Sequence, residues 1–381
     1  MGQPLTLGIE LIDDPNWMGG TLYLQNLAIC LSRLPAQERP HVRLLGSPEI
    51  VANFTARHGP LPGINSSPKS LLQRISQRLG LPQKQPPAID VIYPGFGAQV
   101  PGAVTMRWIP DFQHRYLPEL FSAEEIAARD ASIGEIAEKP GVVVVSSQTA
   151  KDDFVRFYPD HRATPRVWHF RSLLTVGDLA IDRLRQTYNL PEKYLYLPNQ
   201  FWVHKNHIAV FKALAQLRHD HGLTIPLVCT GATRDRRNEA HFAGLMSFVE
   251  DQGLADQIQF LGLIDRADQV GILRCAAAVV QPSRFEGWST VVEDVRAVGR
   301  PIFLSDLPVH REQAPPHCVY FSPEDSIALA KALQQGWDDL LPGPDLAAER
   351  AAKQQVDQYI LNSAHSFCNI ARDAIALVKA H

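Results

Sequence analysis

Long apolar runs are missing from this chain: nowhere do about 18 consecutive apolar residues follow one another, so we expect no membrane-spanning helix. The first residues lead almost at once into an apolar segment and show neither a charged leader nor a cleavable apolar run, which argues against a secretory signal. Cysteine is scarce. The five cysteines have no C-x-x-C spacing and are expected to be reduced core residues of a cytoplasmic protein: Cys30, Cys229, Cys275, Cys318 and Cys368.

An excess of either charge is missing too. With 37 basic and 40 acidic side chains the net charge is only −3, and the sequence has no basic stripe or nucleic-acid recognition motif. DNA and RNA are therefore not expected as partners. No G-x-G-x-x-G follows an expected strand, and this absence argues against a dinucleotide-dependent oxidoreductase.

Short apolar runs alternate with helical patterns along most of the 381 residues. This alternation predicts an α/β protein with parallel sheets covered by helices on both faces. The length exceeds what one core usually holds and favours two domains of about 170 residues each. The pattern breaks between residues 170 and 194, so we place the first domain at residues 1–172 and the second at residues 186–345.

Residues 281–301, QPSRFEGWSTVVEDVRAVGRP, carry the most functional information. An apolar strand at residues 276–280 precedes a loop, and Val291, Val295 and Val298 then mark one face of a helix that begins at Ser289 or Thr290. The helix start would present backbone N–H groups and a positive helix end beside the carboxyl end of a strand. Such a place suits a phosphorylated ligand.

Three acidic residues lie near this helix start. Glu286 belongs to neither apolar face and would point toward the bound ligand, although a solvated loop carboxylate remains the alternative. Glu293 follows Thr290 in a T-x-x-E pattern that predicts a capping box. Asp294 lies one turn inside the helix, far enough from Glu286 to contact another part of a nucleotide sugar.

The segment PSRFEGWSTVVEDVRAVGRPIFLSD resembles the retaining glycosyltransferases of family 4, which carry an E-x7-E element in the C-terminal domain of a GT-B fold. The resemblance implies that Glu286 contacts the donor sugar and that Asp294 binds the ribose. Asp294 is one methylene shorter than the family's Glu, so Glu293 is the alternative for that contact. The diphosphate would be held by the backbone amides of Gly287, Trp288, Ser289 and Thr290.

Two further stretches agree with the family. Gly19 and Gly20 follow the opening strand in a turn that faces the donor phosphates in the family, and they let the backbone approach a ligand closely. Lys205 lies where a loop meets a helix starting at about Asn206, within reach of a diphosphate. The family usually has an Arg five or six residues before this Lys.

Here Asn199 and Gln200 occupy the positions of that Arg. One cationic contact is therefore missing, and Lys205 with the backbone amides would hold the diphosphate alone or together with another basic residue such as Arg234.

A third stretch, WIPDFQHRYLPEL, follows an expected strand at residues 104–108. The family often has a His-Asp pair lining the acceptor cleft here. Asp111 matches the Asp, whereas His114 either donates and accepts protons at the acceptor or is a structural histidine among aromatic residues. The resemblance also implies nucleoside contacts by Gly231, Leu263 and Ile264.

Taken together, the resemblance implies a GT-B fold: two Rossmann-like doubly wound domains facing each other across a cleft, with a terminal helix at about residues 355–381 crossing back to the first domain. It implies retaining transfer of a hexosyl group from a nucleotide diphosphate sugar to an acceptor hydroxyl, in polysaccharide or glycoconjugate biosynthesis. No cofactor or metal is expected. A nucleotide-sugar epimerase or a non-catalytic binding subunit remains the alternative.

Residues 61–87 are rich in Pro, Ser and Gln and carry four basic residues but no acid. Within them, residues 69–81 predict a basic amphipathic helix, which either packs on its own domain or lies on an anionic membrane surface near a lipid-linked acceptor. The acceptor is accordingly a saccharide or a lipid-linked saccharide. The expected location is the cytoplasm, with peripheral contact at the inner face of the membrane through this segment.

Overall fold

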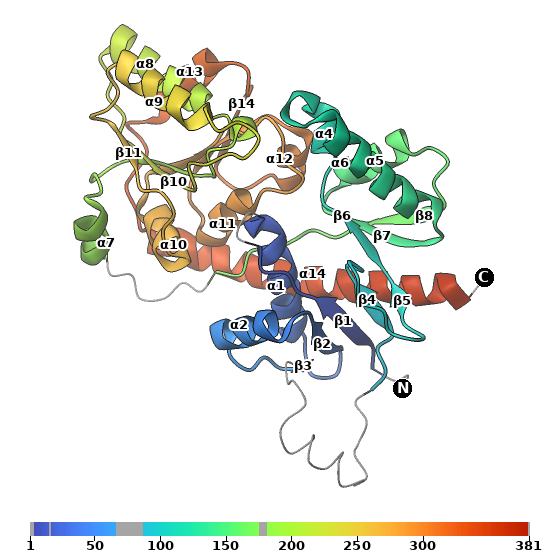
Figure 1. Cartoon of the computed structure of the whole chain (residues 1–381). Helices are drawn as coiled ribbons and strands as arrows, with labels where there is room; N and C mark the ends of the chain where they lie inside the picture. Colours follow the sequence, from blue (N-terminus) through green and yellow to red (C-terminus); the bar gives the residue numbers. More distant parts are fainter. Residues whose placement is uncertain (1–3, 15–16, 66–86, 175–180, 380–381) are drawn as a thin grey trace. The chain divides into compact units, whose positions relative to one another are not determined.

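The computed structural model describes residues 4–14, 17–65, 87–174 and 181–379 (Figure 1). These residues form two compact units. Unit 1 comprises Met1–Asp111, Arg129–Arg171 and Asp357–His381, and unit 2 comprises Phe112–Ala128 and Ser172–Val356. The segment Phe112–Ala128 thus groups with unit 2, although the sequence around it belongs to unit 1. Residues 69–81, the expected amphipathic helix, lie outside the described residues.

Unit 1 contains two parallel sheets. The larger has the strand order β3-β2-β1-β4-β5: β1 (Thr6–Glu10), β2 (His41–Leu45), β3 (Ile64–Asn65), β4 (Val91–Tyr93) and β5 (Val104–Thr105). The smaller has the order β6-β7-β8: β6 (Arg107–Ile109), β7 (Gly141–Val145) and β8 (Ala163–Val167). The single strand expected at residues 104–108 is therefore wrong. It is divided at the buried Met106, and its two parts pair in different sheets.

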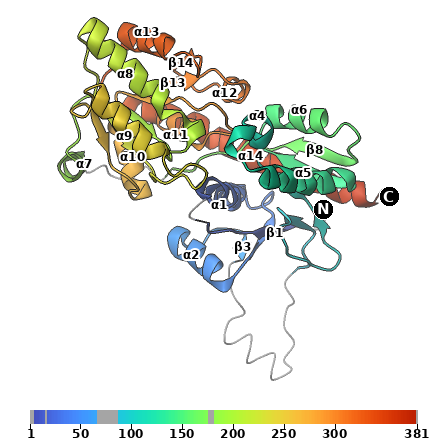
Figure 2. The ribbon, with the colours of Figure 1, turned by 45° about the horizontal axis from the view of Figure 1, so that its top comes forward.

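Helices connect these strands, and Figure 2 shows α1 lying over β1. Those in unit 1 are α1 (Met18–Ser32), α2 (Pro48–His58), the later part of α5 (Ala123–Glu138) and α6 (Gln148–Phe157). The helix α4 (Gln113–Tyr116) and the 3-10 turn η1 (Pro118–Leu120) also lie between β6 and β7 but group with unit 2. Strands β1 and β7 are buried along nearly their whole length, as is typical of parallel sheets covered on two faces, and β7 is a continuous apolar run, GVVVV.

Unit 2 is built on one parallel six-stranded sheet with the order β11-β10-β9-β12-β13-β14. Its strands are β9 (Leu195–Pro198), β10 (Leu227–Thr230), β11 (Ile258–Phe260), β12 (Ala278–Gln281), β13 (Ile302–Ser305) and β14 (Cys318–Phe321). In the register Leu195 lies opposite Leu227 on one side and opposite Ala278 on the other. β9 is therefore the central strand from which the chain moves outward in both directions.

Helices cover both faces of this sheet (Figure 1). Leu195 and Leu197 of β9 pack in a core with α8, α9 and α13, whereas Tyr194 and Tyr196 pack in the opposite core with α7, α10 and α11. The helices are α7 (Ile181–Tyr188), α8 (His207–His221), α9 (His241–Asp251), α10 (Arg266–Cys275), α11 (Thr290–Val298), α12 (Pro308–Gln313) and α13 (Ser326–Gly336). This is the predicted α/β arrangement.

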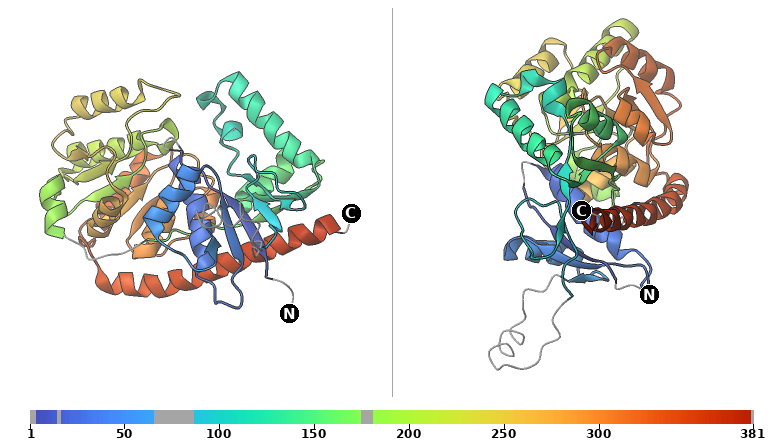
Figure 3. Two further views of the ribbon diagram at one scale, coloured as in Figure 1. Left: turned by 60° about the horizontal axis from the view of Figure 1, so that its bottom comes forward. Right: turned by 90° about the vertical axis from the view of Figure 1, so that its right-hand side faces the viewer.

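The last helix, α14 (Leu346–Lys379), begins in unit 2 and ends in unit 1 (Figure 3). In unit 1 its Phe367 packs edge-on against Tyr93 and Trp168. The indole of Trp168 donates to the carbonyl of Ser363 at 3.0 Å, and the Ser363 hydroxyl donates to the carbonyl of His169 at 2.9 Å. A terminal helix that returns to the first domain, as the resemblance implied, is thus part of the fold.

Candidate functional site

The site of interest lies at the carboxyl ends of β9 and β12 in unit 2. These two strands are neighbours in the sheet, yet the chain leaves β9 toward β10 on one side and reaches β12 on the other. Loops that leave such adjacent strands in opposite directions open a crevice, where ligands of doubly wound proteins usually bind. The loop after β9 carries Lys205 and the loop after β12 carries Glu286, so the sheet topology brings these two predicted residues together.

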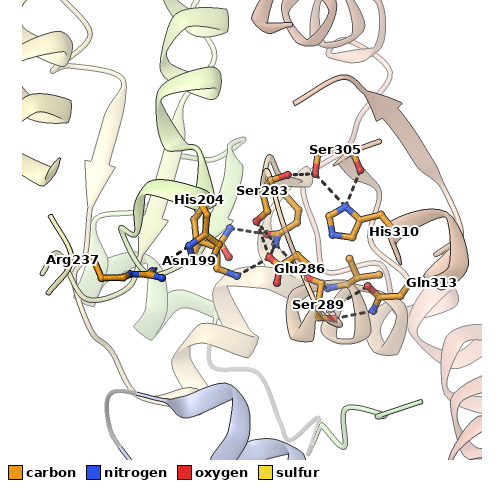
Figure 4. A network of polar contacts seen from close by, with 12 residues as sticks. Asn199, His204, Arg237, Ser283, Glu286, Ser289, Ser305, His310 and Gln313 are labelled. Atoms are coloured by element: carbon orange, nitrogen blue, oxygen red, sulfur yellow. Dashed lines mark hydrogen bonds and ion pairs between the residues drawn. The ribbon is translucent and has the colours of Figure 1, made fainter. Parts of the chain in front are cut away.

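Lys205 and Glu286 form an ion pair, with Nζ 2.6 Å from Oε1. The Lys205 side chain is 15% exposed and that of Glu286 is 9% exposed, so water screens their attraction only weakly. Oε1 of Glu286 also accepts from the hydroxyl of Ser283 at 2.7 Å and from Nε2 of Gln281 at 2.9 Å (Figure 4). Glu286 is therefore a fixed, largely buried carboxylate and not a solvated loop residue.

The charge state of Glu286 follows from two opposing effects. Burial alone would raise its pKa, because a carboxylate loses its hydration there. The ammonium of Lys205, the neighbouring His310 and the hydrogen bonds from Lys205 and Ser283 outweigh burial and lower the pKa below its usual value. At neutral pH the site therefore holds a carboxylate beside an ammonium.

Lys205 is held by the short turn in which it lies. It ends the 3-10 turn η2 (Val203–Lys205), and Asn206 then adopts a left-handed conformation with φ of 57° before α8 begins. Nδ2 of Asn206 donates to the carbonyls of Pro282 and Pro323, and the backbone N–H of Val203 donates to Asp235. The lysine's backbone is thus tied both to the Glu286 loop and to the loop after β10.

Helix α11 starts beside the ion pair, and its first residue is Thr290, as predicted. Its N-cap is Ser289, whose hydroxyl accepts from the backbone N–H of Val292. The backbone N–H of Ser289 donates to Oε1 of Gln313, which makes Ser289 one proposed diphosphate-binding amide that already has a partner.

The predicted capping box of Thr290 and Glu293 is wrong, because Ser289 is the N-cap and Glu293 therefore lies one position too far along the helix. The Glu293 carboxylate instead accepts from Nε2 of Gln313 at 3.1 Å and lies near Arg296 inside the unit. It is 2% exposed.

Asp294, the expected ribose-binding residue, is buried and already has two partners. Its Oδ1 accepts from the hydroxyl of Ser172 and from Nη2 of Arg266, both at 2.5 Å. Arg266 begins α10, directly after the loop that carries Leu263 and Ile264. Leu263 is 68% exposed, whereas Ile264 packs against the core on the α10 and α11 side of the sheet.

Asn199 and Gln200, which occupy the positions of the family's Arg, both form hydrogen bonds within unit 2. Nδ2 of Asn199 donates to Oε1 of Gln281 at 2.7 Å, and Oε1 of Gln200 accepts from the backbone N–H of Ala232 at 2.7 Å. Gly231 passes close by with φ of 139°, and a Cβ there would lie 2.1 Å from the carbonyl oxygen of Asn199. Gly231 therefore has a structural reason to be glycine.

The arginine near the site is Arg237 and not Arg234, the residue that the sequence suggested as a further diphosphate contact. Arg234 pairs with Glu239 on the surface, and both side chains are more than two-thirds exposed. Arg237 is the arginine that contacts the site: Nη2 lies 3.4 Å from Nδ1 of His204, and the guanidinium lies over the ring of Trp202 (Figure 4). Sequence spacing did not single out Arg237, because three arginines follow one another within four positions.

Two other buried groups were missed by sequence reasoning. Gln281 ends β12 and links Asn199, Ser283 and Glu286 into one network. His310 of α12 is fully buried, with Nδ1 donating to the carbonyl of Ser305 at 2.8 Å, and burial lowers its pKa so that it is neutral at pH 7. In the sequence, the only signal for His310 is its position shortly after the apolar strand β13.

The candidates from the first half of the chain lie elsewhere. Gly19 and Gly20 do not form a turn, which corrects the prediction: they lie in the first turn of α1, and Gly20 has no room for a Cβ because the Trp17 ring would be 2.6 Å away. Asp111 follows β6 and is the last residue of its part of unit 1. His114 lies in α4, buried, with the rings of Phe112 and Phe121 about it.

The described residues show neither a metal site nor a membrane-spanning helix. Across the described ranges, no three His, Cys, Asp or Glu side chains gather in a way that would hold a metal ion. In the same ranges no helix has the length and apolarity needed to cross a membrane. The described cysteines carry no disulfide, and four of the five are buried: Cys30, Cys229, Cys275 and Cys368.

Comparison with known proteins gives the fold a context. Residues 181–352 match the model of the family described as Glycosyl transferases group 1. No curated protein matches the chain significantly.

Several solved structures are similar over almost the full length of both chains. A glycosyltransferase from Rickettsia africae has a TM-score of 0.64 and 15% identity, with 98% of this chain and 99% of that chain covered. The HepE protein of Anabaena in complex with UDP-glucose has a TM-score of 0.61 and 15% identity, with 99% of each chain covered. Sucrose-phosphate synthase from Thermosynechococcus elongatus has a TM-score of 0.59 and 15% identity, with 99% and 98% covered. The chain thus has the two-domain fold of the GT-B glycosyltransferases, and the Lys205–Glu286 site lies in the part that matches Glycosyl transferases group 1.

Proposed function

We propose that the protein is a retaining glycosyltransferase of family 4 that moves a hexosyl group from a nucleotide diphosphate sugar to an acceptor hydroxyl. The observation that carries the proposal is the largely buried ion pair between Lys205 and Glu286 at the crevice between β9 and β12, beside the start of α11. A positive group, a helix start and a fixed carboxylate are what a sugar diphosphate needs from its binding site.

Lys205 would stabilise the leaving group. Departure of the nucleotide diphosphate builds negative charge on the phosphate oxygens, and a cation fixed in advance lowers the barrier most where that charge develops. An ammonium has three N–H donors, and Glu286 takes one of them. The other two donors can serve phosphate oxygens, together with backbone amides at the start of α11.

Glu286 would orient the donor sugar. The hydrogen bonds to its carboxylate from Lys205, Ser283 and Gln281 all reach Oε1. Within the described ranges no hydrogen bond reaches Oε2, which leaves this oxygen to accept from a sugar hydroxyl. A carboxylate fixed in this way positions the sugar and is a poor nucleophile. Retention would then follow from attack on the face that the leaving phosphate occupies, with that phosphate accepting the proton.

The donor test begins with UDP-glucose, because the HepE structure was solved with this compound. Thermal melting is measured with UDP-, GDP-, ADP- and dTDP-glucose, since a ligand of the native state raises the melting temperature. Nucleotide release is then followed with and without saccharide acceptors, and the anomeric configuration of the product is read by NMR. Release that requires an acceptor, with retention, is the expected result. Full activity in excess EDTA is also expected, because Lys205 supplies the positive charge.

Glu286→Gln and Lys205→Met test the residues directly. Each is expected to lower acceptor-dependent release by at least about a hundredfold, as removal of a charge-stabilising group does in other enzymes. Arg234→Gln is the matched control, because Arg234 is a surface residue of the same unit. Equal release by all three variants would refute the assignment.

A non-catalytic nucleotide-sugar-binding subunit or an epimerase-like relative is the second candidate. It is favoured by the hydrogen bonds of Asn199 and Gln200 where the family has a cation, and by the partners that Asp294 already has. Binding of a donor without release under any acceptor would support the subunit, and a changed sugar on the recovered nucleotide would support the epimerase. The cellular role we propose is polysaccharide or glycoconjugate biosynthesis in the cytoplasm.

A further inference from the structure

Unit 1 has a crevice position of its own. In its larger sheet β1 lies between β2 and β4, and the chain moves from β1 to β2 on one side before it returns at β4 on the other. The carboxyl ends of β1 and β4 therefore have the same topological relation as those of β9 and β12 in unit 2. Glu10 ends β1, and residues 94–98 follow β4 directly.

A column of nearly parallel aromatic rings reaches the surface here. The rings of Phe170 and Tyr23 stack at 6.0 Å, those of Tyr23 and Trp108 at 4.0 Å, and those of Trp108 and Trp17 at 5.3 Å. The first three residues are buried, whereas Trp17 is half-buried. Phe96 is 50% exposed, with its ring centroid 6.4 Å from that of Trp108. We call Trp17, Phe96 and Trp108 the aromatic platform.

Two sets of contacts fix the platform in place. Gly20 lies against the Trp17 ring, and any Cβ there would collide with it. The carboxylate of Glu10 accepts from three successive backbone N–H groups, those of Phe96 at 2.7 Å, Gly97 at 3.1 Å and Ala98 at 2.6 Å. Because the rings need no rearrangement before they meet a ligand, a weak stacking partner loses little affinity to ordering.

The same three bonds decide the charge of the ligand. Successive N–H groups that converge on one point make a natural anion site. Here Glu10 fills that site with its own carboxylate, so the three N–H groups beside the platform are not available to a phosphate or carboxylate of a ligand. The ring faces carry partial negative charge and attract the weakly positive C–H groups of an apolar ligand face.

We propose that the aromatic platform binds an uncharged pyranose ring, with the C–H face of the sugar stacked on the half-exposed Phe96 ring and its edge against Trp17, because the Phe96 ring is inclined by 44° to that of Trp108. The binding follows from unit 1 alone. That this sugar is the acceptor of the transfer reaction rests on the proposed function. The acceptor subsite would thus select neutral saccharides over sugar phosphates and uronic acids.

Saturation-transfer difference NMR tests the binding with methyl α-glucopyranoside and maltose as neutral probes and glucose 6-phosphate as the charged counterpart. Saturation of the protein's aromatic protons should reach the ring C–H protons of the neutral probes. Phe96→Ala should weaken binding about three- to tenfold, and Phe96→Tyr should retain it. Leu341→Ala, which removes a side chain 73% exposed in unit 2, is the control and should change nothing.

Glu10→Gln tests the selection by charge. It removes the carboxylate and should bring the binding of glucose 6-phosphate closer to that of the neutral probes. The proposal is overturned if no neutral probe receives saturation, or if Phe96→Ala leaves the saturation transfer to the neutral probes unchanged. It is also overturned if uridine binds to the platform in preference to the glycosides.

Melting shifts with nucleotide sugars, measured on the same variants, report unit 2 separately. Saccharide binding without any nucleotide-sugar binding would remove the proposed function and keep the platform. Nucleotide-sugar binding without saccharide binding would do the reverse.

Discussion

Removal of Lys205 gives the sharpest test of how the buried ion pair works. In Lys205→Met, Glu286 keeps its hydrogen bonds from Ser283 and Gln281 but loses the cation 2.6 Å from its Oε1. Breaking one side of a buried pair usually costs about 3 to 5 kcal/mol, because the remaining charge stays buried. Since two hydrogen bonds remain, we expect the lower end, about 3 kcal/mol of unfolding free energy near neutral pH.

The pH dependence has a definite sign. In the native protein the pKa of Glu286 is lowered, so the carboxylate contributes stability that is present above the unfolded-state pKa and is lost as pH falls through the folded pKa. Without Lys205 burial raises this pKa, and the penalty of the buried charge disappears as the group takes up a proton. The difference between the two proteins should therefore be largest at about pH 7 and clearly smaller at about pH 4.5.

Equilibrium urea unfolding at these two pH values measures the effect. The double variant Lys205→Met with Glu286→Gln should recover part of the loss, because it removes the uncompensated charge as well. Arg234→Met breaks an exposed pair in the same unit and serves as the control, for which little change is expected. A loss below about 1 kcal/mol at neutral pH, or a loss that does not change with pH, would refute the account of a buried pair.

Three further predictions follow from single contacts. Gly231→Ala should destabilise the protein by more than about 2 kcal/mol in urea unfolding, because its Cβ would overlap the carbonyl of Asn199. Gly244→Ala in α9 is the control and should be neutral or slightly stabilising, since a Cβ there meets nothing within 4 Å. Equal effects of the two substitutions would contradict this reasoning. Ser289→Ala removes the N-cap of α11 and should cost about 1 kcal/mol, while Ser289→Asn should restore most of it in the same assay. Asp294→Asn should weaken nucleotide-sugar binding in calorimetry if this residue contacts the ribose, and unchanged affinity would mean that Asp294 only holds Arg266 and Ser172.

The alternation of strands and helices was readable from sequence because the central parallel strands are buried on both faces. The runs at residues 195–197 and 227–229 are apolar throughout and lie in β9 and β10. Both ends of α11 follow local rules as well. Ser289 caps its start, and Gly299, with φ of 68°, ends it. Fold class and helix start thus depend on local rules that a sequence displays.

Other features depend on which strands become neighbours, and sequence alone does not display this. The network around Gln281 arises because β12 pairs with β9 and not with β11, the strand that precedes it along the chain. Likewise, Gly20 suggested a loop, but the Trp17 ring accounts for it within a helix. Glycines and buried amides are therefore explained by tertiary neighbours, which one-dimensional spacing does not identify.

The order in which the chain leaves the ribosome differs from the order in which its parts can be completed. Trp168 packs against Ser363 and Phe367 of α14 in unit 1. The hydrophobic core of unit 1 is therefore incomplete until α14 has been synthesised. Unit 2 has all its strands by residue 321 and is the part equipped to mature first. Shortened chains that stop at residue 356, where α14 passes into unit 1, should therefore accumulate with a formed second half and an unfinished first half.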